Sequence, residues 1–388
     1  MSKGPGGPEL VAVVTGSRAE FGLLAPVMEA IDGHRGLRLA VVAGGAHLLA
    51  PGLTINEVRA RWPVAAEVQM QEPGAVPSRE GDAAAVGRGI MGFARVFAAL
   101  RPGWVLVLGD RVEAFAAAAA GSIAGLAVAH VHAGDRAEGI ADEAMRHAIT
   151  KLAHLHLAAT EESRRRVLGL GERPEHALNV GSPAIDGLVG IGALSEAEAG
   201  ELGDPRVVVL LHPSGLPAER ERRLAEAVLA AGRAATPRML VLAPNHDPGS
   251  EVIREVISAG AGVAGGPSCV REHLPRGVFL GLLGRLSRKG GVLLGNSSAG
   301  LIEAAALGLP CINVGPRQGG RERAGNVIDV PERELGSLAG RVAEALALPR
   351  PRAVTHPYGD GRAGVRIADA LAERDPRDPA LLRKRNGF

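Results

Sequence analysis

Short apolar runs alternate with segments of helical periodicity along most of this chain. In the first half, the apolar runs lie at 11–14, 37–42, 104–108, 127–131 and 157–160. Segments whose apolar residues recur every three to four positions lie between them, at 21–31, 90–100, 112–123 and 140–157. Pro102 ends the helix predicted at 90–100. Apolar strands alternating with amphipathic helices predict a parallel, doubly wound α/β sheet.

The alternation weakens at 187–204, a stretch rich in Gly, Ala and Glu that we interpret as a linker, and then restarts. Further strands are predicted at 207–211, 239–242, 291–294 and 310–314, with helices at 218–231, 250–258, 300–307, 335–346 and 364–372. Two successive doubly wound halves predict two facing Rossmann-like domains. We place them at 1–186 and 205–365, followed by a helix and tail at 366–388.

Composition narrows the class of protein. A length of 388 residues fits about two domains. The net charge of only +2 and the 2% aromatic content argue against a nucleic-acid partner. Cys269 and Cys311 form neither a metal-ligand spacing nor a disulfide framework, and the polar N-terminus has no apolar signal core. We therefore expect a cytoplasmic protein without a membrane partner.

Polar residues gather directly after the predicted strands, where ligands bind in open α/β sheets. They are Arg18, Asp110, Arg111, His132, Asp135, His212, Asn245, Asp247, Ser297 and Ser298. Each of them alone is a weak signal, because polar side chains are common in loops. Their concentration at strand ends in both halves predicts a ligand-binding cleft.

One of these loops suits phosphate. The sequence GNSSAG at 295–300 is a turn of small residues before a predicted helix, where backbone N–H groups and the helix dipole attract anions. A simple helix cap is the alternative interpretation. No G-x-G-x-x-G fingerprint follows a strand and no P-loop motif occurs, which disfavours NAD and P-loop chemistry. His130 and His132 alternate on one strand, but without an ordered ligand spacing we expect no metal site and no cofactor.

Several motifs together resemble the hydrolysing UDP-N-acetylglucosamine 2-epimerases of sialic-acid-type pathways. They are TGSRAEFGLL at 15–24, GDRVE at 109–113, RHAITKL at 146–152, PNHDPGS at 244–250, GNSSAGLIE at 295–303, RQGGR at 317–321 and NV at 326–327. The resemblance implies a glycosyltransferase-B-like fold with a C-terminal helix that crosses back to the first domain. It also implies a UDP-sugar substrate, no redox cofactor, and a homodimer or homotetramer.

The resemblance implies elimination of UDP to a glycal, followed by addition of water with inversion at C2, which yields N-acetylmannosamine. Such chemistry needs carboxylates at C2 and donors for the departing diphosphate. By position, the catalytic residues are Asp110, Asp135, Asp142 and His212. The substrate-binding residues are Arg18, Arg111, His132, Glu138, Arg146, His147, Asn245, Asp247, Ser297, Ser298, Glu303 and Arg321.

One position departs from the family pattern. The family usually has His-Gly-Gly-Glu after the strand at 127–131, whereas this chain has HAGD at 132–135. Replacing Glu by Asp shortens the side chain by one methylene, so either the pocket has moved inward or the substrate or outcome has changed. Three alternatives remain beside the 2-epimerase: an enzyme acting on another nucleotide sugar or without C2 inversion, a glycosyltransferase, and a non-catalytic nucleotide-sugar sensor.

Overall fold

The alternating pattern folds into two parallel sheets, each in its own compact unit. The computed structural model describes residues 7–50, 53–74, 78–137, 142–244, 247, 249–261, 269–349 and 355–385. Unit 1 consists of Met1–Asp135, Asp142–Asp186 and Gly359–Phe388, and unit 2 of Arg136–Ala141 and Gly187–Tyr358. The predicted doubly wound α/β fold is therefore confirmed, and the segment predicted as a linker belongs to unit 2.

Unit 1 contains a seven-stranded sheet of order β3-β2-β1-β4-β5-β6-β7. Its strands are β1 Glu9–Thr15, β2 Leu37–Gly44, β3 Val64–Val68, β4 Trp104–Leu108, β5 Ala127–Val131, β6 Leu155–Ala158 and β7 Ala177–Asn179. Its helices are α1 Arg18–Asp32, α2 Ile55–Arg59, α3 Arg79–Leu100, α4 Val112–Ile123, α5 Asp142–Leu152, α6 Glu161–Gly169, α13 Ala363–Ala372 and α14 Pro379–Leu382. The strand order reverses between β1 and β4, and ligands of such sheets bind at that point.

The central strands of this sheet are buried on both faces. Successive strand residues point to opposite sides, and helices cover each side. In β1, Val11 and Val13 belong to the core under α1 and α13, whereas Ala12 and Val14 belong to the core under α3 and α4. Most residues of the central strands are therefore apolar, and the buried exceptions include His130 of β5 and His156 of β6. This explains why the strands appear in the sequence as continuous apolar runs.

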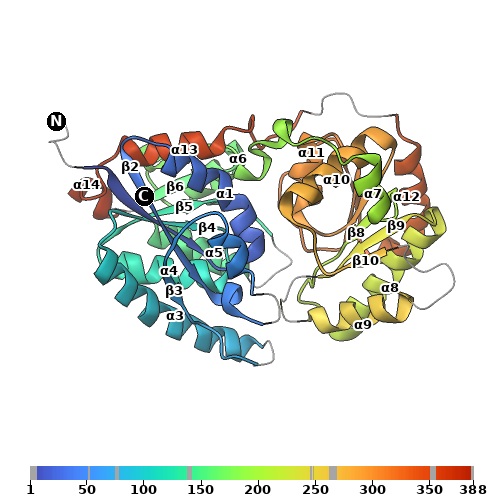
Figure 1. Ribbon diagram of the computed structural model, residues 1–388, viewed down its shortest axis with the longest axis horizontal. Helices are drawn as coiled ribbons and strands as arrows, with labels where there is room; N and C mark the ends of the chain where they lie inside the picture. The colour runs from blue at the N-terminus through green and yellow to red at the C-terminus, as the bar shows by residue number, and fades with distance from the viewer. Residues whose placement is uncertain are drawn as a thin grey trace. The chain divides into compact units, whose positions relative to one another are not determined.

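The C-terminal segment packs on the start of the chain. Helix α13 lies beside α1 (Figure 1), so closely that a Cβ atom on Gly364 would stand 2.6 Å from the carbonyl oxygen of Pro26. The carboxylate of Asp186 accepts hydrogen bonds from the backbone N–H groups of Ala363 and Gly364 at 2.9 and 2.6 Å. Residues far apart in sequence thus complete one layer of unit 1.

The C-terminal tail is also fixed by a charged cluster around Glu172. The Glu172 carboxylate contacts Lys151 at 2.6 Å, His156 at 3.0 Å and Lys384 at 2.8 Å. Burial alone would raise the pKa of Glu172, but hydrogen bonds from His156, Lys151 and Lys384 outweigh it and lower the pKa to about 2. Lys384 also donates to the carbonyl oxygen of Lys151 at 2.8 Å, near the end of α5.

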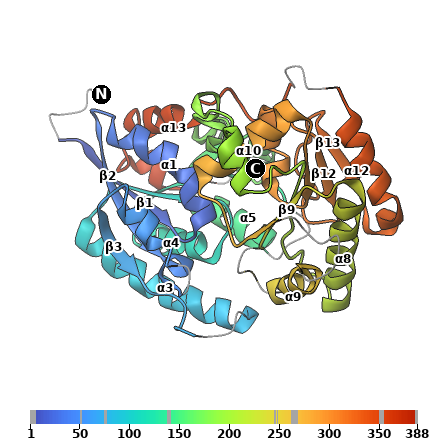
Figure 2. The ribbon, with the colours of Figure 1, turned by 45° about the vertical axis from the view of Figure 1, so that its right-hand side comes forward.

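Unit 2 contains a six-stranded sheet of order β10-β9-β8-β11-β12-β13. Its strands are β8 Val207–Leu210, β9 Met239–Leu242, β10 Cys269–Arg271, β11 Val292–Gly295, β12 Cys311–Val314 and β13 Val327–Val330. Its helices are α7 Glu196–Glu201, α8 Ala218–Ala235, α9 Ser250–Ala261, α10 Arg276–Lys289, α11 Glu303–Ala306 and α12 Leu338–Ala347. Helix α12 packs beside α8 on one face (Figure 2), and α10 contributes to the core on the other.

Three sequence predictions of local structure were wrong. The helix predicted at 140–157 ends at Leu152, because residues 155–157 pair with β5 as part of strand β6, which begins two residues before the strand predicted at 157–160. The stretch 187–204 contains helix α7, which begins with a capping box between Ser195 and Glu198. The helix predicted at 300–307 is broken into the 3-10 turn η5 (Ser298–Gly300) and the short α11. Asn326 binds the carbonyl oxygen of Gly300 at 3.1 Å and so competes with helical hydrogen bonding there.

One helix of the described chain, α3, is long and apolar enough to cross a membrane, judged by length and composition alone. Core helices of many proteins satisfy the same criterion. Here α3 packs against α4 and β3. Ser78 caps the start of α3, and its hydroxyl accepts a hydrogen bond from the N–H of Gly81 at 3.0 Å.

Candidate functional site

Asp110 lies at the end of β4, where the sheet of unit 1 changes direction. Gly109, which precedes it, has a φ of 77°, a conformation that favours glycine and turns the chain sharply out of the strand. The Asp110 carboxylate forms an ion pair with Arg146 of α5. The Arg146 side chain is only 3% exposed, whereas that of Asp110 is 17% exposed. The structure therefore brings together two predicted site residues and leaves the carboxylate accessible.

Arg111 is held by a buried carboxylate that the sequence analysis did not select. Its Nε lies 3.3 Å from Glu113, whose side chain is fully buried. Glu113 also accepts a hydrogen bond from the N–H of Ala46 at 3.2 Å. A Cβ atom on Gly16 or Gly45 would stand within 2.5 Å of the Glu113 side chain, so both loops need glycine. Glu113 thus fixes the loops after β1 and β2 as well as Arg111.

Arg18 begins α1, directly after β1. Its Nε lies 3.1 Å from Glu57, and burial lowers the pKa of its guanidinium. Nearby Glu20 accepts a hydrogen bond from the N–H of Gly16 at 3.0 Å. Burial, together with the charge of Glu113, raises the pKa of Glu20 to about 7. The loop after β1 therefore contains one arginine and one carboxyl group that is easily protonated.

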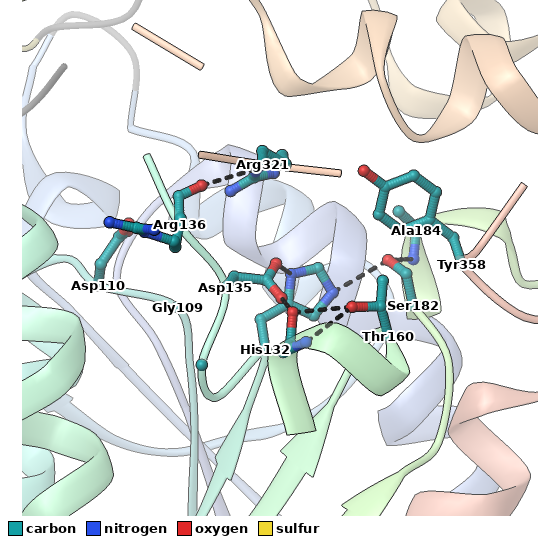
Figure 3. A network of polar contacts seen from close by, with 12 residues as sticks. Gly109, Asp110, His132, Asp135, Arg136, Thr160, Ser182, Ala184, Arg321 and Tyr358 are labelled. Atoms are coloured by element: carbon teal, nitrogen blue, oxygen red, sulfur yellow. Dashed lines mark hydrogen bonds and ion pairs between the residues drawn. The ribbon is translucent and has the colours of Figure 1, made fainter. Parts of the chain in front are cut away.

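The end of β5 carries a polar network (Figure 3). The imidazole of His132 lies between Asp135, at 3.2 Å from Nδ1, and Ser182, at 3.0 Å from Nε2. The hydroxyl of Ser163 donates to Asp135 at 2.8 Å, and that of Thr160 donates to Ser163 at 3.0 Å. The structure thus joins the two predicted residues His132 and Asp135 and adds three hydroxyl groups that the sequence analysis missed.

Helix α5 contributes the remaining predicted residues of unit 1. His147 lies 3.3 Å from Glu143 on the same helix, one turn earlier. Asp142 is the first residue of α5. The predicted residues Glu138 and Asn245 lie outside the described residues.

In unit 2, a buried amide positions His212 after β8. Asn296 is 0% exposed, and its side chain accepts from the N–H of His212 and donates to the carbonyl oxygen of His212, both at 2.8 Å. The same amide donates to the hydroxyl of Ser214 at 3.2 Å. Gln318 donates to the carbonyl oxygen of Asn296 at 2.9 Å. Asn296 thus ties the loops after β8, β11 and β12 together.

Ser297 and Ser298 follow Asn296 at the end of β11. The hydroxyl of Ser297 caps η5 by accepting from the N–H of Ala299 at 3.4 Å. Glu303 is buried at the start of α11 and lies 3.4 Å from Arg276, the first residue of α10. The break between η5 and α11 weakens the helix-dipole argument that the sequence suggested, because the dipole of a four-residue helix is small.

The last predicted residues lie in loops of unit 2. Arg321 donates a hydrogen bond to the carbonyl oxygen of Arg136 at 3.1 Å. Both residues belong to unit 2. Asp247 lies in the loop between β9 and α9. Over the ranges that the structure describes, no group of three or more His, Cys, Asp and Glu side chains is arranged to hold a metal ion.

The residues that sequence reasoning missed are mainly partners of the predicted ones. Glu113 and Asn296 lie within the motifs GDRVE and GNSSAG, but motif position alone does not reveal that a side chain is buried and holds neighbouring loops. Ser163 follows a Thr cap in TEES at 160–163, a helix-start signal that marks a hydroxyl beside a strand end. Ser182 follows β7, a three-residue strand too short for periodicity to reveal.

Two doubly wound parallel units, with polar side chains at the carboxyl ends of their strands, define a glycosyltransferase-B-like fold. The structure of UDP-GlcNAc 2-epimerase from Methanocaldococcus jannaschii, in complex with UDP-GlcNAc and UDP, superposes with a TM-score of 0.79 at 18% identity. The match covers 94% of this chain and 100% of that one. At this identity the likeness concerns the fold.

The sequence places the chain within that fold class. The family model described as UDP-N-acetylglucosamine 2-epimerase matches residues 29–372, and the chain belongs to this family. It is 34% identical over 386 residues to a hydrolysing UDP-N,N'-diacetylbacillosamine 2-epimerase of Legionella pneumophila, covering 97% of this chain and 99% of the relative. It is 30% identical over 350 residues to a UDP-N-acetylglucosamine 2-epimerase of Neisseria meningitidis, covering 87% and 88%.

Proposed function

We propose that the protein is a hydrolysing 2-epimerase of a UDP-linked 2-acetamido sugar. It would release UDP and a sugar that is inverted at C2. With UDP-GlcNAc as the substrate, the released sugar would be N-acetylmannosamine. The observation that carries the proposal is Asp110: a partly exposed carboxylate, oriented by Arg146 at the strand-order reversal, in a chain that matches the family over nearly its whole length. A carboxylate so placed is suited to proton transfer.

The reaction begins with cleavage of the C1–O bond. The C2 proton of a neutral sugar is barely acidic, so the C1–O bond breaks first and UDP departs with the bonding electrons. The oxocarbenium-like centre at C1 acidifies C2–H, and a carboxylate removes that proton to leave a glycal. Water then adds across the double bond, placing a hydroxyl at C1 and a proton on C2 from the opposite face.

The predicted site residues divide by the part of the reaction that they serve. In our proposal, Asp110 and Asp142 of unit 1 serve the proton transfers. Arg18, His212, Ser297 and Ser298 stabilise the diphosphate as its charge develops, and Glu303 accepts ribose hydroxyls. The remaining predicted binding residues orient the sugar and nucleotide around these groups.

The sugar itself has two candidates. UDP-GlcNAc is the substrate that the family description names. UDP-N,N'-diacetylbacillosamine is favoured by the Legionella relative, because that match extends over 97% of this chain at 34% identity. Both are UDP-linked 2-acetamido sugars, so the same elimination and addition applies to each.

Incubation of the protein with each donor in D₂O tests the proposal. We expect UDP release together with one deuterium at C2 of a sugar inverted at that carbon. UDP release without C2 deuterium would indicate hydrolysis without inversion. Consumption of donor only when a sugar acceptor is added would indicate a glycosyltransferase, and UDP binding without turnover of any donor would indicate a sensor.

A further inference from the structure

The carboxylate of Asp135 is turned into the protein. The residue is 1% exposed, and its two oxygens lie 2.8 Å from the Ser163 hydroxyl and 3.2 Å from Nδ1 of His132. In Figure 3 Asp135 lies against the His132 ring. The carboxylate of Asp110, in contrast, is 17% exposed at the end of the neighbouring strand. These two carboxylates of unit 1 therefore have different surroundings.

The contacts of His132 favour one of its two neutral tautomers. Nδ1 lies in an ion-pair contact with the Asp135 carboxylate, and because a carboxylate only accepts hydrogen bonds, this contact favours the tautomer with hydrogen on Nδ1. In the neutral ring, Nε2 then accepts from the hydroxyl of Ser182, 3.0 Å away. The Ser182 oxygen also accepts from the N–H of Ala184 at 3.2 Å.

This line of Ser182, His132 and Asp135 has the order of a nucleophilic triad, but Ser182 is 0% exposed. A nucleophile needs an accessible oxygen, and this one caps a 3-10 turn, η3 (Pro183–Ile185). The arrangement is therefore a buried polar network that fixes backbone.

The network holds together the ends of three adjacent strands. Asp135 lies after β5, Ser163 is in α6 after β6, and Ser182 follows β7. It also holds His132 at a φ of 63°, which is unfavourable for a residue with a side chain. Space is tight here, since a Cβ atom on Gly134 would stand 2.1 Å from the carbonyl oxygen of Ser163.

The same turn is connected to the neighbour of Asp110. The N–H of Gly109 donates to the carbonyl oxygen of Val131 at 3.0 Å, and His130 Nε2 lies 2.7 Å from the carbonyl oxygen of Gly109. A displacement of the end of β5 therefore moves the residue that precedes Asp110. Through these contacts, Asp135 can influence the position of Asp110 without contacting the sugar.

We propose that Asp135 is a positioning residue in this protein, one that fixes the His132 tautomer and the end of β5, and that it does not transfer the C2 proton. This inference rests on the proposed function and deepens it. It also accounts for Asp in place of the longer Glu: the short side chain matches the 2.8 Å contact with Ser163 inside a space that is already full.

The kinetic experiment follows UDP release and C2 deuterium together in D₂O. We expect Asp135→Asn and Ser163→Ala each to lower kcat by about 10- to 100-fold, the loss that a misplacement of about 1 Å causes. In both variants, deuterium at C2 per UDP released should stay at the wild-type ratio. The double variant should be no slower than the slower single variant, because both changes break one network.

The controls separate positioning from catalysis. Asp110→Asn should lower the rate of deuterium incorporation at C2 by about 10²- to 10⁴-fold, as expected for removal of a general base. Ser287→Ala removes a buried hydroxyl in unit 2 that donates to the carbonyl oxygen of Leu307 at 2.7 Å, and it should keep the wild-type kcat. If Asp135→Asn lowers the deuterium at C2 per UDP released while Ser163→Ala keeps the wild-type kcat, Asp135 is the base and the proposal is wrong.

A spectroscopic experiment tests the network independently of turnover. In ¹⁵N-histidine-labelled protein, the His132 resonances, assigned by their loss in His132→Gln, should show the Nδ1–H tautomer. Asp135→Ala should abolish that preference, and an unchanged His132 tautomer would refute the proposal. If the wild type turns over no UDP-linked 2-acetamido sugar, the proposed function fails, whereas this spectrum still decides whether Asp135 holds His132.

Discussion

Replacing Asn296 by alanine should loosen the loop after β8 and weaken nucleotide binding. The Asn296 amide makes two 2.8 Å hydrogen bonds to the backbone of His212 and is 0% exposed. Alanine would leave the N–H and the carbonyl oxygen of His212 without these contacts. Each of the two abandoned groups costs about 1–3 kcal/mol, so we expect Asn296→Ala to lower the free energy of unfolding by about 2–6 kcal/mol.

Asn296→Asp is the sharper variant. It keeps an oxygen to accept from the N–H of His212 but places a second, charged oxygen against the carbonyl oxygen of His212. Two acceptors then face each other, so the aspartate variant should be at least as unstable as the alanine variant. Asn313→Ala is the matched control, because Asn313 is also a buried amide of unit 2 but donates to the side chain of Asp329, in β13, at 2.6 Å.

The measurements are urea unfolding, amide hydrogen exchange and UDP titration. We expect Asn296→Ala to accelerate exchange of the His212 amide and to raise the Kd for UDP by about tenfold, equivalent to about 1.4 kcal/mol. Asn313→Ala should leave both quantities near their wild-type values. If Asn296→Ala keeps wild-type exchange at His212 and binds UDP as tightly as Asn313→Ala, then the amide does not position this loop.

Three further predictions follow from single contacts. The pKa of Glu172 is lowered to about 2, so its ionised form stabilises the fold above about pH 4.5, and this stabilisation is lost as the pH falls toward 2. In thermal unfolding from pH 6 to 2, Glu172→Gln should therefore lose less stability than the wild type over this range. Gly134→Ala should destabilise unit 1 by about 1–3 kcal/mol more than Gly125→Ala in urea unfolding, because both glycines have a positive φ but only Gly134 lacks space for a Cβ atom. Arg18→Ala should weaken UDP binding by about 10- to 100-fold through loss of a charged hydrogen bond, whereas Arg59→Ala, on an exposed ion pair, should leave a calorimetric titration unchanged.

The sequence predicted strands well because burial on both faces leaves little choice of residue. The bounds of β4, β5 and β9 agree with their apolar runs, since nearly every position points into a core on one face of its sheet. Helices with one exposed face were less certain: α3 begins at Arg79, eleven positions before its apolar periodicity becomes clear at residue 90. Short edge strands such as β7 carry too few residues to show a period.

The candidate site divides in the same way. Motif spacing and strand-end position marked Asp110, Arg146 and His132, because a parallel sheet places such residues at one edge whatever surrounds them. The local sequence said nothing about which carboxylate stays exposed. That depends on partners distant in the chain, such as Ser163 for Asp135, and on the space left by α6.

The sequence alone thus determined the two sheets, the family and the residue types at the strand ends, because these follow from periodicity and motif order. Only the tertiary structure decided how those residues are used. It turned Asp135 inward onto Ser163 and His132, left Asp110 partly exposed beside Arg146, and returned the C-terminal α13 to α1. The physical reason is that hydrogen bonding and burial of a side chain depend on contacts between segments far apart in sequence, which no local pattern encodes.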